Sequence, residues 1–420
     1  MATVRSSNPL VWLFDPIRPT ADGAEDRFRF TGSAMAWIVP LGIGIVALIA
    51  TVAMGMAGED HKQFYFSYLT AWAFGLSISL GGLFFVLIQH LTRARWSVVF
   101  RRIPEALLWS FPVLAVLGIP ILLGMHDLYH WTHGELLDPA DPHYDPVIAG
   151  KAGYLNTPFF LARLAFYFAA WTYLAYRLYT GSIRQDESRN IENTRSMRFT
   201  SAWGLAVAAV TTAFASYDIL MSLDPHWFST IFGVYFFAGS FMAIMAFMIL
   251  MAMTFQTGGM LEEVTKEHFQ DLGKFMFGFV VFWAYIAFSQ YMLIWYGNLP
   301  EETVWYEHRL MHGWEAHSAA LLLAHFILPF IILIGRWAKR LKPLLAFMAV
   351  WLLIMHWFDF HWLAMPVLHA DHAQFHPLDF TALIAIGGIL AGLVVFRLSR
   401  HSIAPQGDPR LGHSLSFKNS

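Results

Sequence analysis

The sequence contains no cysteine, and that absence excludes several kinds of redox site. Without a thiolate the chain cannot ligate an iron–sulfur cluster, and without a Cys-x-x-Cys-His motif it cannot attach a c-type haem. A secreted domain stabilised by disulfides is excluded for the same reason. Any redox cofactor held by this chain would therefore depend on histidine ligands or on no protein ligand at all.

Charged residues are also scarce. Only 13% of the 420 residues are Asp, Glu, Lys or Arg, whereas 57% are hydrophobic. The charged fraction is about half that of a typical soluble domain, and a soluble chain of this size could not bury so much apolar surface. A disordered chain and a nucleic-acid-binding protein are excluded by the same numbers. The composition predicts a polytopic integral membrane protein.

Common catalytic motifs are missing as well. The sequence has no P-loop, no Rossmann glycine pattern, no nucleophile elbow and no His-Glu-x-x-His motif, so we expect no standalone catalysis. Residues 1–33 contain four arginines but no apolar core of a cleavable signal, which predicts a cytoplasmic N-terminal tail. Within it, Val11–Phe14 is expected to anchor at the membrane interface.

Ten hydrophobic stretches are each long enough to cross a bilayer as a helix. We therefore predict an all-α membrane domain over residues 34–398, followed by a cytoplasmic C-terminal tail over 399–420. The count allows two four-helix bundles, at about 65–222 and 227–366, with one flanking helix at each end. The predicted spans are 34–57, 65–91, 103–124, 156–179, 199–222, 227–256, 273–297, 313–336, 343–366 and 377–398.

Basic residues are distributed unequally between the two sides of the predicted membrane domain. One side holds 23 of the 27 Lys and Arg residues, the other side holds 3, and Arg163 lies within a span. The positive-inside rule then places both termini in the cytoplasm. Histidine gathers on the opposite side, as expected for a bacterial inner-membrane protein that meets a periplasmic partner. These histidines are His61, His126, His130, His133, His143, His226, His308, His312, His369, His372 and His376.

Arg163 is an ionisable residue inside the fourth predicted span, and such residues are costly to bury. It shares a helix face with Asn156 and Tyr167, and it needs a carboxylate, a carbonyl or a polar ligand. Asp127 and Asp218 are the candidate carboxylates at similar depth. The arrangement predicts either a polar pocket suited to a quinone head group or a structural ion pair between helices.

Asp218 also lies on a polar stripe of the fifth predicted span together with Thr211. Hydroxyl groups can hold water and a carboxylate can exchange a proton, so the stripe is a candidate proton path. The alternative is a carboxylate at the membrane edge that caps the hairpin over residues 222–226.

The ninth predicted span contains His356, Asp359 and His361. His356 and Asp359 are three residues apart and share a face, whereas His361 points elsewhere. A buried histidine–carboxylate pair can hold a proton near neutral pH. The full set of candidates for proton conduction adds His325, Glu315, Tyr285 and Ser289 from the neighbouring spans.

Three alternatives remain for these histidines and for those on the outer side. The polar residues of the last spans could be satisfied core groups that specify helix packing. His325 with His356 or His361 is the one deep combination that could ligate a b-type haem. His126, His130 and His133 resemble a surface zinc site, although a solvated helix explains them better, so we expect no metal.

Three stretches carry a family resemblance. Residues 77–102 (SISLGGLFFVLIQHLTRARWSVVFRR), 224–239 (DPHWFSTIFGVYFFAG) and 290–306 (QYMLIWYGNLPEETVWY) resemble the F subunit of bacterial alternative complex III. The resemblance implies a fold like that of the NrfD-type membrane subunit of polysulfide reductase, with two four-helix bundles plus flanking helices. It also implies the inner membrane and a role in oxidising quinol for a periplasmic cytochrome c or an oxidase.

The resemblance further implies partners and cofactors. Fe–S clusters and c-type haems lie on other subunits, and this chain holds no covalent cofactor and at most a quinone such as menaquinone. The expected partners are a C-type membrane subunit, a periplasmic Fe–S and molybdopterin-like subunit, multihaem cytochromes c, a terminal oxidase and lipids, but no nucleic acid.

Two roles are associated with subunits of the F type, and each has candidate residues here. A quinone pocket near the outer side would use His126, Asp127, Arg163 and Asp218. Proton movement coupled to quinol oxidation would use His325, His356, Asp359 and His361. A proton-coupled secondary transporter and a purely structural anchor are the alternatives from other functional classes.

Overall fold

The computed structural model describes residues 28–58 and 61–419, which form helices joined by turns and loops, with no strand among them. Ten helical segments of this part are long and apolar enough to cross a membrane, which confirms the prediction of an all-α, ten-span protein. The segments are Met35–Met56 (α2), Lys62–Leu91 (α3), Val98–Leu123 (with α4, Arg102–Leu107, α5, Ser110–Leu117, and α6, Ile119–Leu123), Thr157–Ser188 (α9), Ile191–Leu223 (with α10, Ile191–Ile219), Phe232–Thr257 (α11), Lys266–Gly297 (α12), Trp314–Leu333 (with α14, Trp314–Ala320, and α15, Leu328–Leu333), Lys342–Leu368 (α17) and Pro377–Leu398 (α18).

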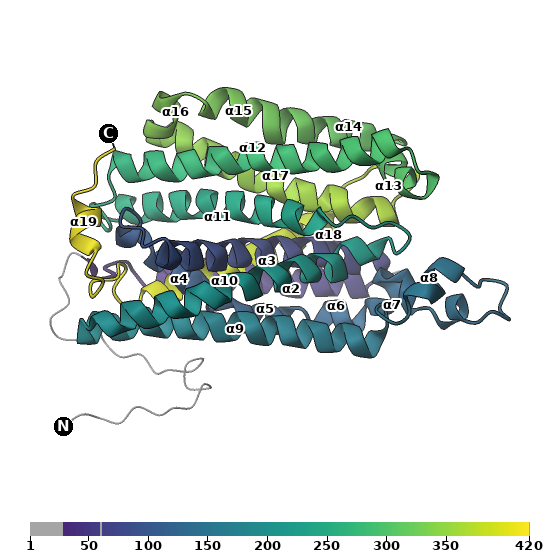
Figure 1. Cartoon of the computed structure of the whole chain (residues 1–420), viewed down its shortest axis with the longest axis horizontal. Helices are drawn as coiled ribbons and strands as arrows, with labels where there is room; N and C mark the ends of the chain where they lie inside the picture. The colour runs from purple at the N-terminus through teal and green to yellow at the C-terminus, as the bar shows by residue number, and fades with distance from the viewer. Residues whose placement is uncertain (1–27, 59–60, 420) are drawn as a thin grey trace.

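The long helices run side by side, and α3 lies in the middle of them (Figure 1). It contacts α10, α11, α17 and α18, and nearly all of its side chains are buried. Helix α9 packs on α10, and α11 packs on both α12 and α17. Because α3 contacts the helices of both halves of the chain, it joins them. The division into two four-helix bundles stays a prediction.

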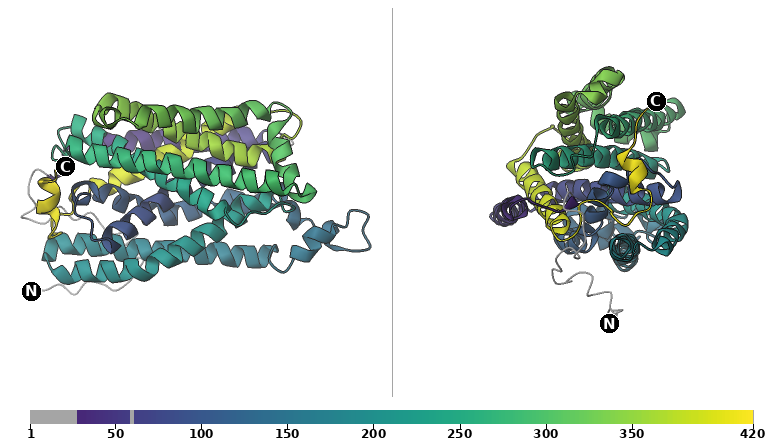
Figure 2. Two further views of the ribbon diagram at one scale, coloured as in Figure 1. Left: turned by 45° about the horizontal axis from the view of Figure 1, so that its top comes forward. Right: turned by 90° about the vertical axis from the view of Figure 1, so that its left-hand side faces the viewer.

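Helix α2 stands at the periphery and packs chiefly on α18 (Figure 2, right). Glycines make this contact close: a Cβ on Gly44 would lie 2.5 Å from the backbone nitrogen of Ile389, and one on Gly388 would lie 2.8 Å from Gly44 Cα. Small residues that let two backbones approach are a usual means of helix association in membranes. Most of the remaining surface of α2 is exposed, as expected for a helix that faces lipid.

Several helices extend beyond their predicted ends because capping residues, not hydropathy, set the boundary. Asn190 accepts a hydrogen bond from the backbone of Glu192 at 2.9 Å and begins α10 eight residues before the predicted span. Thr265 begins α12 in the same way, and Asn298 in the left-handed conformation ends it. A hydropathy profile detects the apolar centre of such a helix but not its polar ends.

The third span is broken into α4, α5 and α6, and the prolines explain the breaks. Pro112 and Pro120 cannot donate a backbone hydrogen bond, which leaves carbonyls without their helical partner. Side chains of α3 bond to other carbonyls of the same span: Trp72 donates to the Leu114 carbonyl at 2.8 Å, and Tyr68 donates to the Leu117 carbonyl at 2.7 Å. These two residues therefore tie the broken span to the central helix.

The eighth span is also irregular. Between α14 and α15, residues Leu321–Ile327 form a π-helical segment that contains His325. Such segments are rare and recur at functional sites. Trp351 of α17 donates to the Ala324 carbonyl at 2.7 Å and so anchors the segment to the neighbouring helix.

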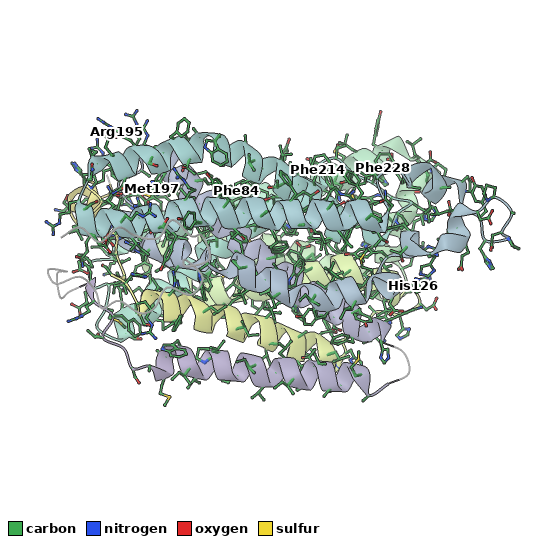
Figure 3. The ribbon with its side chains drawn as sticks, turned by 90° about the horizontal axis from the view of Figure 1, so that it is seen from below. Phe84, His126, Arg195, Met197, Phe214 and Phe228 are labelled. Atoms are coloured by element: carbon green, nitrogen blue, oxygen red, sulfur yellow. The ribbon has the colours of Figure 1, made fainter. Side chains whose placement is uncertain are left out.

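The two ends of the helix assembly differ. We call the end that carries Arg195 the basic end and the end that carries His126 the histidine-rich end, and the two residues lie at opposite ends in Figure 3. At the histidine-rich end, short helices including α7 (Met125–Leu128) and α8 (Pro146–Lys151) form a protrusion (Figure 1). Helix α13 (Pro300–Leu310) joins α12 and α14 at the same end.

The C-terminal segment, predicted as a cytoplasmic tail over residues 399–420, is described to residue 419 and lies at the basic end. It folds across the ends of the helices and includes α19 (Leu411–Leu415), and many of its side chains are buried. Ser414 donates to the Trp96 carbonyl at 2.7 Å, and the backbone of Ile403 donates to the Phe28 carbonyl at 3.0 Å. Hydropathy missed this because the segment is polar. The predicted anchor Val11–Phe14 lies outside the described residues.

Candidate functional site

An ion pair between α9 and α10 occupies the interior near the histidine-rich end. Arg163 donates from Nε to Asp218 Oδ2 at 2.9 Å and from Nη2 to Asp218 Oδ1 at 2.8 Å. This two-point geometry is the strongest that a guanidinium and a carboxylate form. The Tyr167 hydroxyl donates to Asp218 at 2.8 Å, and Arg163 Nη1 donates to the Tyr154 carbonyl at 2.8 Å. Of the two candidate carboxylates, the structure therefore pairs Arg163 with Asp218.

Aromatic rings cover the same guanidinium. Its carbon lies 3.8 Å from the centroid of the Tyr154 ring and 4.4 Å from that of Phe159. Burial and the nearby charge of Asp218 raise the pKa of Tyr154, so its hydroxyl stays neutral. Since every nitrogen of Arg163 already donates and a ring faces its plane, the residue has little capacity left to bind a ligand.

The proposed proton stripe on α10 is occupied by structural hydrogen bonds. Thr211 accepts from Trp171 Nε1 at 2.9 Å and donates to the Val207 carbonyl at 2.7 Å, so it holds α9 against α10. Ser222 donates to the Asp218 carbonyl at 2.6 Å and closes the helix end. The alternative that the Asp218 carboxylate caps the hairpin over residues 222–226 is therefore wrong as well, because this carboxylate binds Arg163.

His126 and Asp127 do not join Arg163 and Asp218. His126 is exposed and stacks on His133, with ring centroids 4.0 Å apart, and Asp127 is half-buried without an ion pair to Arg163. The cause is that the chain leaves the helix at this point and the protrusion begins. The four residues predicted to share one pocket are thus split between the surface and the interior. In the described part of the chain, no group of three His, Asp or Glu side chains is arranged to hold a metal ion.

Asp359 on α17 is the centre of a second buried polar cluster. Tyr235 of α11 donates its hydroxyl to Oδ1, and Trp283 of α12 donates Nε1 to Oδ2 at 3.1 Å. Only about 1% of Asp359 is exposed. Within the described ranges no Lys, Arg or His side chain forms an ion pair with this carboxyl group, so neutral donors alone compensate it. A proton can therefore join or leave Asp359 without breaking a salt bridge.

His356 does not form the ion pair with Asp359 that its spacing predicted. Its Nε2 lies 2.9 Å from the Ser77 hydroxyl of α3, and its Nδ1 is buried without a partner. Gly239 of α11 faces the ring, and a Cβ at this position would lie 2.6 Å from His356 Cε1. The imidazole is thus turned toward α3 and fits only because residue 239 has no side chain.

His325 completes this cluster from the π-helical segment. Its ring lies against that of Trp283, with centroids 4.0 Å apart and ring planes tilted by 38°. His325 is fully buried, and neither ring nitrogen has a hydrogen-bond partner among the described residues. Buried polar atoms without a partner are uncommon and mark places where water or a proton is accommodated. We use the name Asp359 cluster for the following residues: Asp359, Tyr235, Trp283, His325, His356 and Ser77.

His361 faces away from the Asp359 cluster, as its position in the helix predicted. Its Nε2 lies 3.5 Å from Asp379 Oδ2 of α18. Asp379 also accepts from the Ser67 hydroxyl of α3 and from the backbone nitrogen of His376 at 2.8 Å, which caps α18. His361 therefore belongs to a separate polar contact that links α3, α17 and α18 near the histidine-rich end.

Three other predicted members of the proton path lie outside the cluster. Tyr285 is 63% exposed, Ser289 is only half-buried, and Glu315 is exposed and accepts from the backbone of Gly313 at 2.8 Å. Tyr285 follows Trp283 by two positions, which turns it by about 200° around α12 and away from the cluster. Glu315 lies in the first turn of α14, where it caps the helix. These three residues therefore do not join the cluster around Asp359, and their part in a proton path stays a prediction.

Sequence reasoning missed Tyr235 and Trp283, although they provide both hydrogen bonds to Asp359. In an apolar helix they look like core aromatics. A signal did exist, because the polar atoms of Tyr and Trp usually need a partner when the ring is buried. Asp359 was the nearest available acceptor on a neighbouring span.

A buried ionic cluster at the basic end was also missed. Arg101 donates to Glu105 at 2.8 Å and to Asp408 of the C-terminal segment at 2.8 Å, and Arg102 donates to Asp186 of α9. Arg101, Arg102 and Glu105 are fully buried. The sequence analysis counted the two arginines as loop charges, because nothing in a hydropathy profile shows that the C-terminal segment returns to cover them.

The buried polar sites of the described residues differ in how their charges are compensated. The Arg163–Asp218 pair and the basic-end cluster are ionic and internally paired, whereas the Asp359 cluster has no cation. Comparison with known proteins assigns no family to the chain, since no family model and no curated protein matches it.

Proposed function

We propose that the chain is a membrane subunit of a bacterial quinol:cytochrome c oxidoreductase of the alternative complex III type, and that its Asp359 cluster takes part in moving protons. In this proposal the chain lies in the cytoplasmic membrane with the basic end in the cytoplasm. Its histidine-rich end supports periplasmic subunits that carry Fe–S clusters and haems. The buried Asp359 carboxyl group, bonded by neutral donors alone, is the observation that carries the proton role.

The stretches that carry the family resemblance support this assignment, because they contain parts of the same site. Residues 77–102 begin with Ser77, which meets His356, and residues 224–239 include Tyr235, which meets Asp359. Residues 290–306 begin with Gln290 and end with Tyr306, which bond each other at 3.1 Å. Each of the three stretches therefore contributes at least one residue to the Asp359 cluster or to its surroundings.

Quinol binding belongs to a partner subunit in this proposal. The residues of this chain that were candidates for a quinone pocket do not fit one, because Arg163 and Asp218 satisfy each other and His126 lies on the surface. Oxidation of a quinol releases two electrons and two protons. The electrons pass to metal centres of the partners, since this chain has no cysteine to hold an Fe–S cluster or attach a c-type haem, and side chains such as Asp359 can accept and release the protons.

Purification of the tagged full-length chain in a mild detergent tests the assignment. We expect multihaem cytochrome c and Fe–S subunits to co-purify, with haem absorption in the optical spectrum and quinol:cytochrome c activity. A chain that purifies alone and colourless would overturn the assignment. A chain that purifies alone with its own haem absorption would show instead that His325 and His356 ligate a haem.

A proton-coupled secondary transporter is the second candidate, and the broken helices favour it. Transporters often bind substrate at interrupted spans, and here the third span is divided by prolines and the eighth contains a π-helical segment. Proteoliposomes that contain only this chain distinguish the two. Solute uptake driven by a pH gradient supports the transporter, whereas its absence together with co-purified redox subunits supports the oxidoreductase.

A further inference from the structure

The Asp359 cluster lies nearer to one end of the helices than to the other. Asp359 is nine residues from the histidine-rich end of α17 and seventeen from its basic end, or about 14 Å and 26 Å of helix. Tyr235, its hydrogen-bond partner, is in the first turn of α11 at the histidine-rich end. A proton on Asp359 thus has a much shorter distance to travel toward that end.

Polar groups continue from Tyr235 toward the histidine-rich surface. Arg309 of α13 is close enough to Tyr235 and Tyr306 to interact electrostatically with both. Tyr306 is bonded to Gln290 of α12, whose Nε2 lies 3.1 Å from the phenol oxygen. Glu307 and His308, which lie between Tyr306 and Arg309 in α13, are exposed. Titratable side chains in contact with water therefore lie directly beside the buried Tyr306 and Arg309.

Arg309 is a buried cation that forms no direct ion pair with a carboxylate among the described residues, although Asp224 is near enough to favour its charge. It donates to the carbonyls of Trp305 at 2.9 Å and Leu363 at 2.8 Å, and its guanidinium carbon lies 3.5 Å from the Trp305 ring centroid. Burial lowers the pKa of Arg309 to about 9, so the group still carries its charge at neutral pH. A cation held in this way orients water and favours release of a proton from its neighbours.

Three buried polar atoms around Arg309 have no hydrogen-bond partner: Arg309 Nε, Gln290 Oε1 and Trp227 Nε1. Trp227 stacks on Trp305 with ring centroids 4.2 Å apart, so these atoms belong to one region. Polar atoms of this kind are usually satisfied by internal water. The unsatisfied atoms therefore indicate a hydrated passage between α11, α12 and α13.

Toward the basic end the surroundings of the cluster are apolar. Between the cluster and that end, the helices that surround it present stretches without a titratable side chain: 241–253 of α11, 275–282 of α12, 326–334 of the eighth span and 343–355 of α17. Ser240, at the edge of this layer, donates to the Phe236 carbonyl of its own helix at 2.7 Å. A layer of two or more helical turns without polar groups holds little water and conducts protons poorly.

We propose that Asp359 exchanges protons with the histidine-rich face alone, through a hydrated passage formed by Tyr235, Tyr306, Gln290 and Arg309. The apolar layer closes the cluster toward the basic face, so this chain releases protons on one side and does not conduct them across the membrane. This inference rests on the proton role proposed above, and it adds the direction of exchange and the residues of the exit.

A competing path would leave the cluster sideways through α3. His356 meets Ser77, and two residues further along α3, on nearly the opposite face, Ser79 accepts from the Ser110 hydroxyl at 2.8 Å. Ser77 and Ser79 each donate to a backbone carbonyl of α3, so their protons are already engaged. The serines lead toward Glu105 and the basic end, which makes them the path that a two-sided channel would use.

Single cysteine substitutions test the proposal directly, because the chain has no cysteine of its own. The probe is a charged, membrane-impermeant methanethiosulfonate reagent, applied to one side at a time of the intact protein in oriented vesicles. Gln290→Cys and Ser318→Cys report on the passage, since the Ser318 hydroxyl donates to the Arg309 carbonyl at 2.6 Å. Ser240→Cys and Ala246→Cys report on the apolar layer, and Ser110→Cys reports on the competing path.

We expect the two passage variants to be labelled from the histidine-rich side at least roughly tenfold faster than the two layer variants, because the reagent needs a hydrated thiolate. We expect no labelling of Ser240→Cys, Ala246→Cys or Ser110→Cys from the basic side. Labelling of any of these three from the basic side would overturn one-sided exchange. Failure of both passage variants to react from the histidine-rich side would also overturn the proposal. Ser318→Cys is included because it is a conservative change, so a folding defect caused by Gln290→Cys alone would not affect the result.

The labelling requires no quinol, so its outcome is independent of the assignment to an oxidoreductase. If labelling is one-sided but Asp359→Asn leaves proton release unchanged, the proton role fails while the passage stands. If labelling reaches the layer from the basic side and Asp359→Asn lowers proton release, the role stands and the one-sided passage fails.

Discussion

Two carboxylates in the membrane domain, Asp218 and Asp359, have opposite surroundings. Asp218 is held by both ends of the Arg163 guanidinium, whereas Asp359 meets only a phenol and an indole. Both are almost completely buried, so burial does not distinguish them. The difference is the cation: the Arg163–Asp218 pair holds two helices together, whereas a carboxyl group that meets no cation can gain or lose a proton without breaking a salt bridge.

The comparison also shows why an ionisable residue inside a membrane is not a functional site by itself. By sequence, Arg163 is the most expensive residue in any span, and it turns out to be fully satisfied within the chain. Asp359 can exchange a proton without breaking a salt bridge, but in the sequence it was recognisable only as a carboxylate beside histidines. The proposed proton exchange depends on the absence of a cation beside Asp359 among the described residues, and a sequence does not show such an absence.

The largest effect is expected from removing one member of the Arg163–Asp218 pair. Asp218→Asn leaves the guanidinium buried without its counter-charge, and Arg163→Leu leaves the carboxylate alone. Breaking a buried pair in this way costs about 3–5 kcal/mol. We expect both variants to lower the thermal unfolding temperature in detergent and to reduce assembly. The double variant Arg163→Leu/Asp218→Leu is the control and should recover much of the loss, and equal destabilisation in all three would contradict the pairing argument.

A somewhat smaller loss is expected at the basic end. Asp408→Asn removes one of the two carboxylates that contact Arg101 but leaves Glu105, so the cost should be about 2–3 kcal/mol. Burial opposes the charge of Asp408, but Arg101 and Arg410 outweigh it and hold its pKa well below the usual range. The pair therefore stabilises the fold above about pH 4, and this contribution is lost as the pH falls through the folded pKa.

The measurement is limited proteolysis of the C-terminal segment, with Glu192→Gln as a matched control, because Glu192 pairs with the exposed Arg195 at the same end of the molecule. Asp408→Asn should release the segment at a lower temperature than either the control or the unmodified protein. Equal protection in the two variants would mean that other contacts, such as those of Ser414, hold the segment.

The positions of the spans could be predicted, and the reason is physical. A helix that crosses a bilayer needs about twenty apolar residues, and all ten stretches of this kind in the chain became helices. The helix ends could not be predicted equally well, because polar caps such as Asn190 and Thr265 carry them beyond the apolar region. The folded C-terminal segment was missed since its burial depends on Arg101, far away in the sequence.

The candidate site could be predicted less well than the fold. Helical spacing correctly separated His361 from Asp359, but it paired His356 with the wrong residue, because Ser77 comes from a helix nearly three hundred residues earlier in the sequence. Spacing along one helix limits which side chains share a face. It carries no information on which neighbouring helix meets that face, so Tyr235 and Trp283 could not be assigned.

Asp359→Asn sharpens the comparison, because it is the same chemical change as Asp218→Asn in the opposite surroundings. The amide oxygen can accept from Tyr235 and no cation is left alone, but the amide nitrogen then faces Trp283 Nε1, which loses its acceptor. The free energy of unfolding should therefore fall by about 1–3 kcal/mol, less than for Asp218→Asn. In the reconstituted complex we expect proton release per electron to fall while assembly is retained. Asp127→Asn, at a half-buried carboxylate of the histidine-rich end, is the matched control. An unchanged ratio would instead support a purely structural anchor.

The smallest effects are expected from residues that the sequence proposed and the structure places on the surface. His126→Ala removes a ring that stacks on His133 in the protrusion, and Tyr285→Leu alters a side chain that is 63% exposed. Surface substitutions of this kind usually change stability by less than about 0.5 kcal/mol. Neither residue contacts the Asp359 cluster, so proton release per electron should equal that of the unmodified complex. If His126→Ala lowered quinol turnover with assembly intact, a quinone would bind at the protrusion, and the contrast between the two carboxylates would no longer describe the functional site.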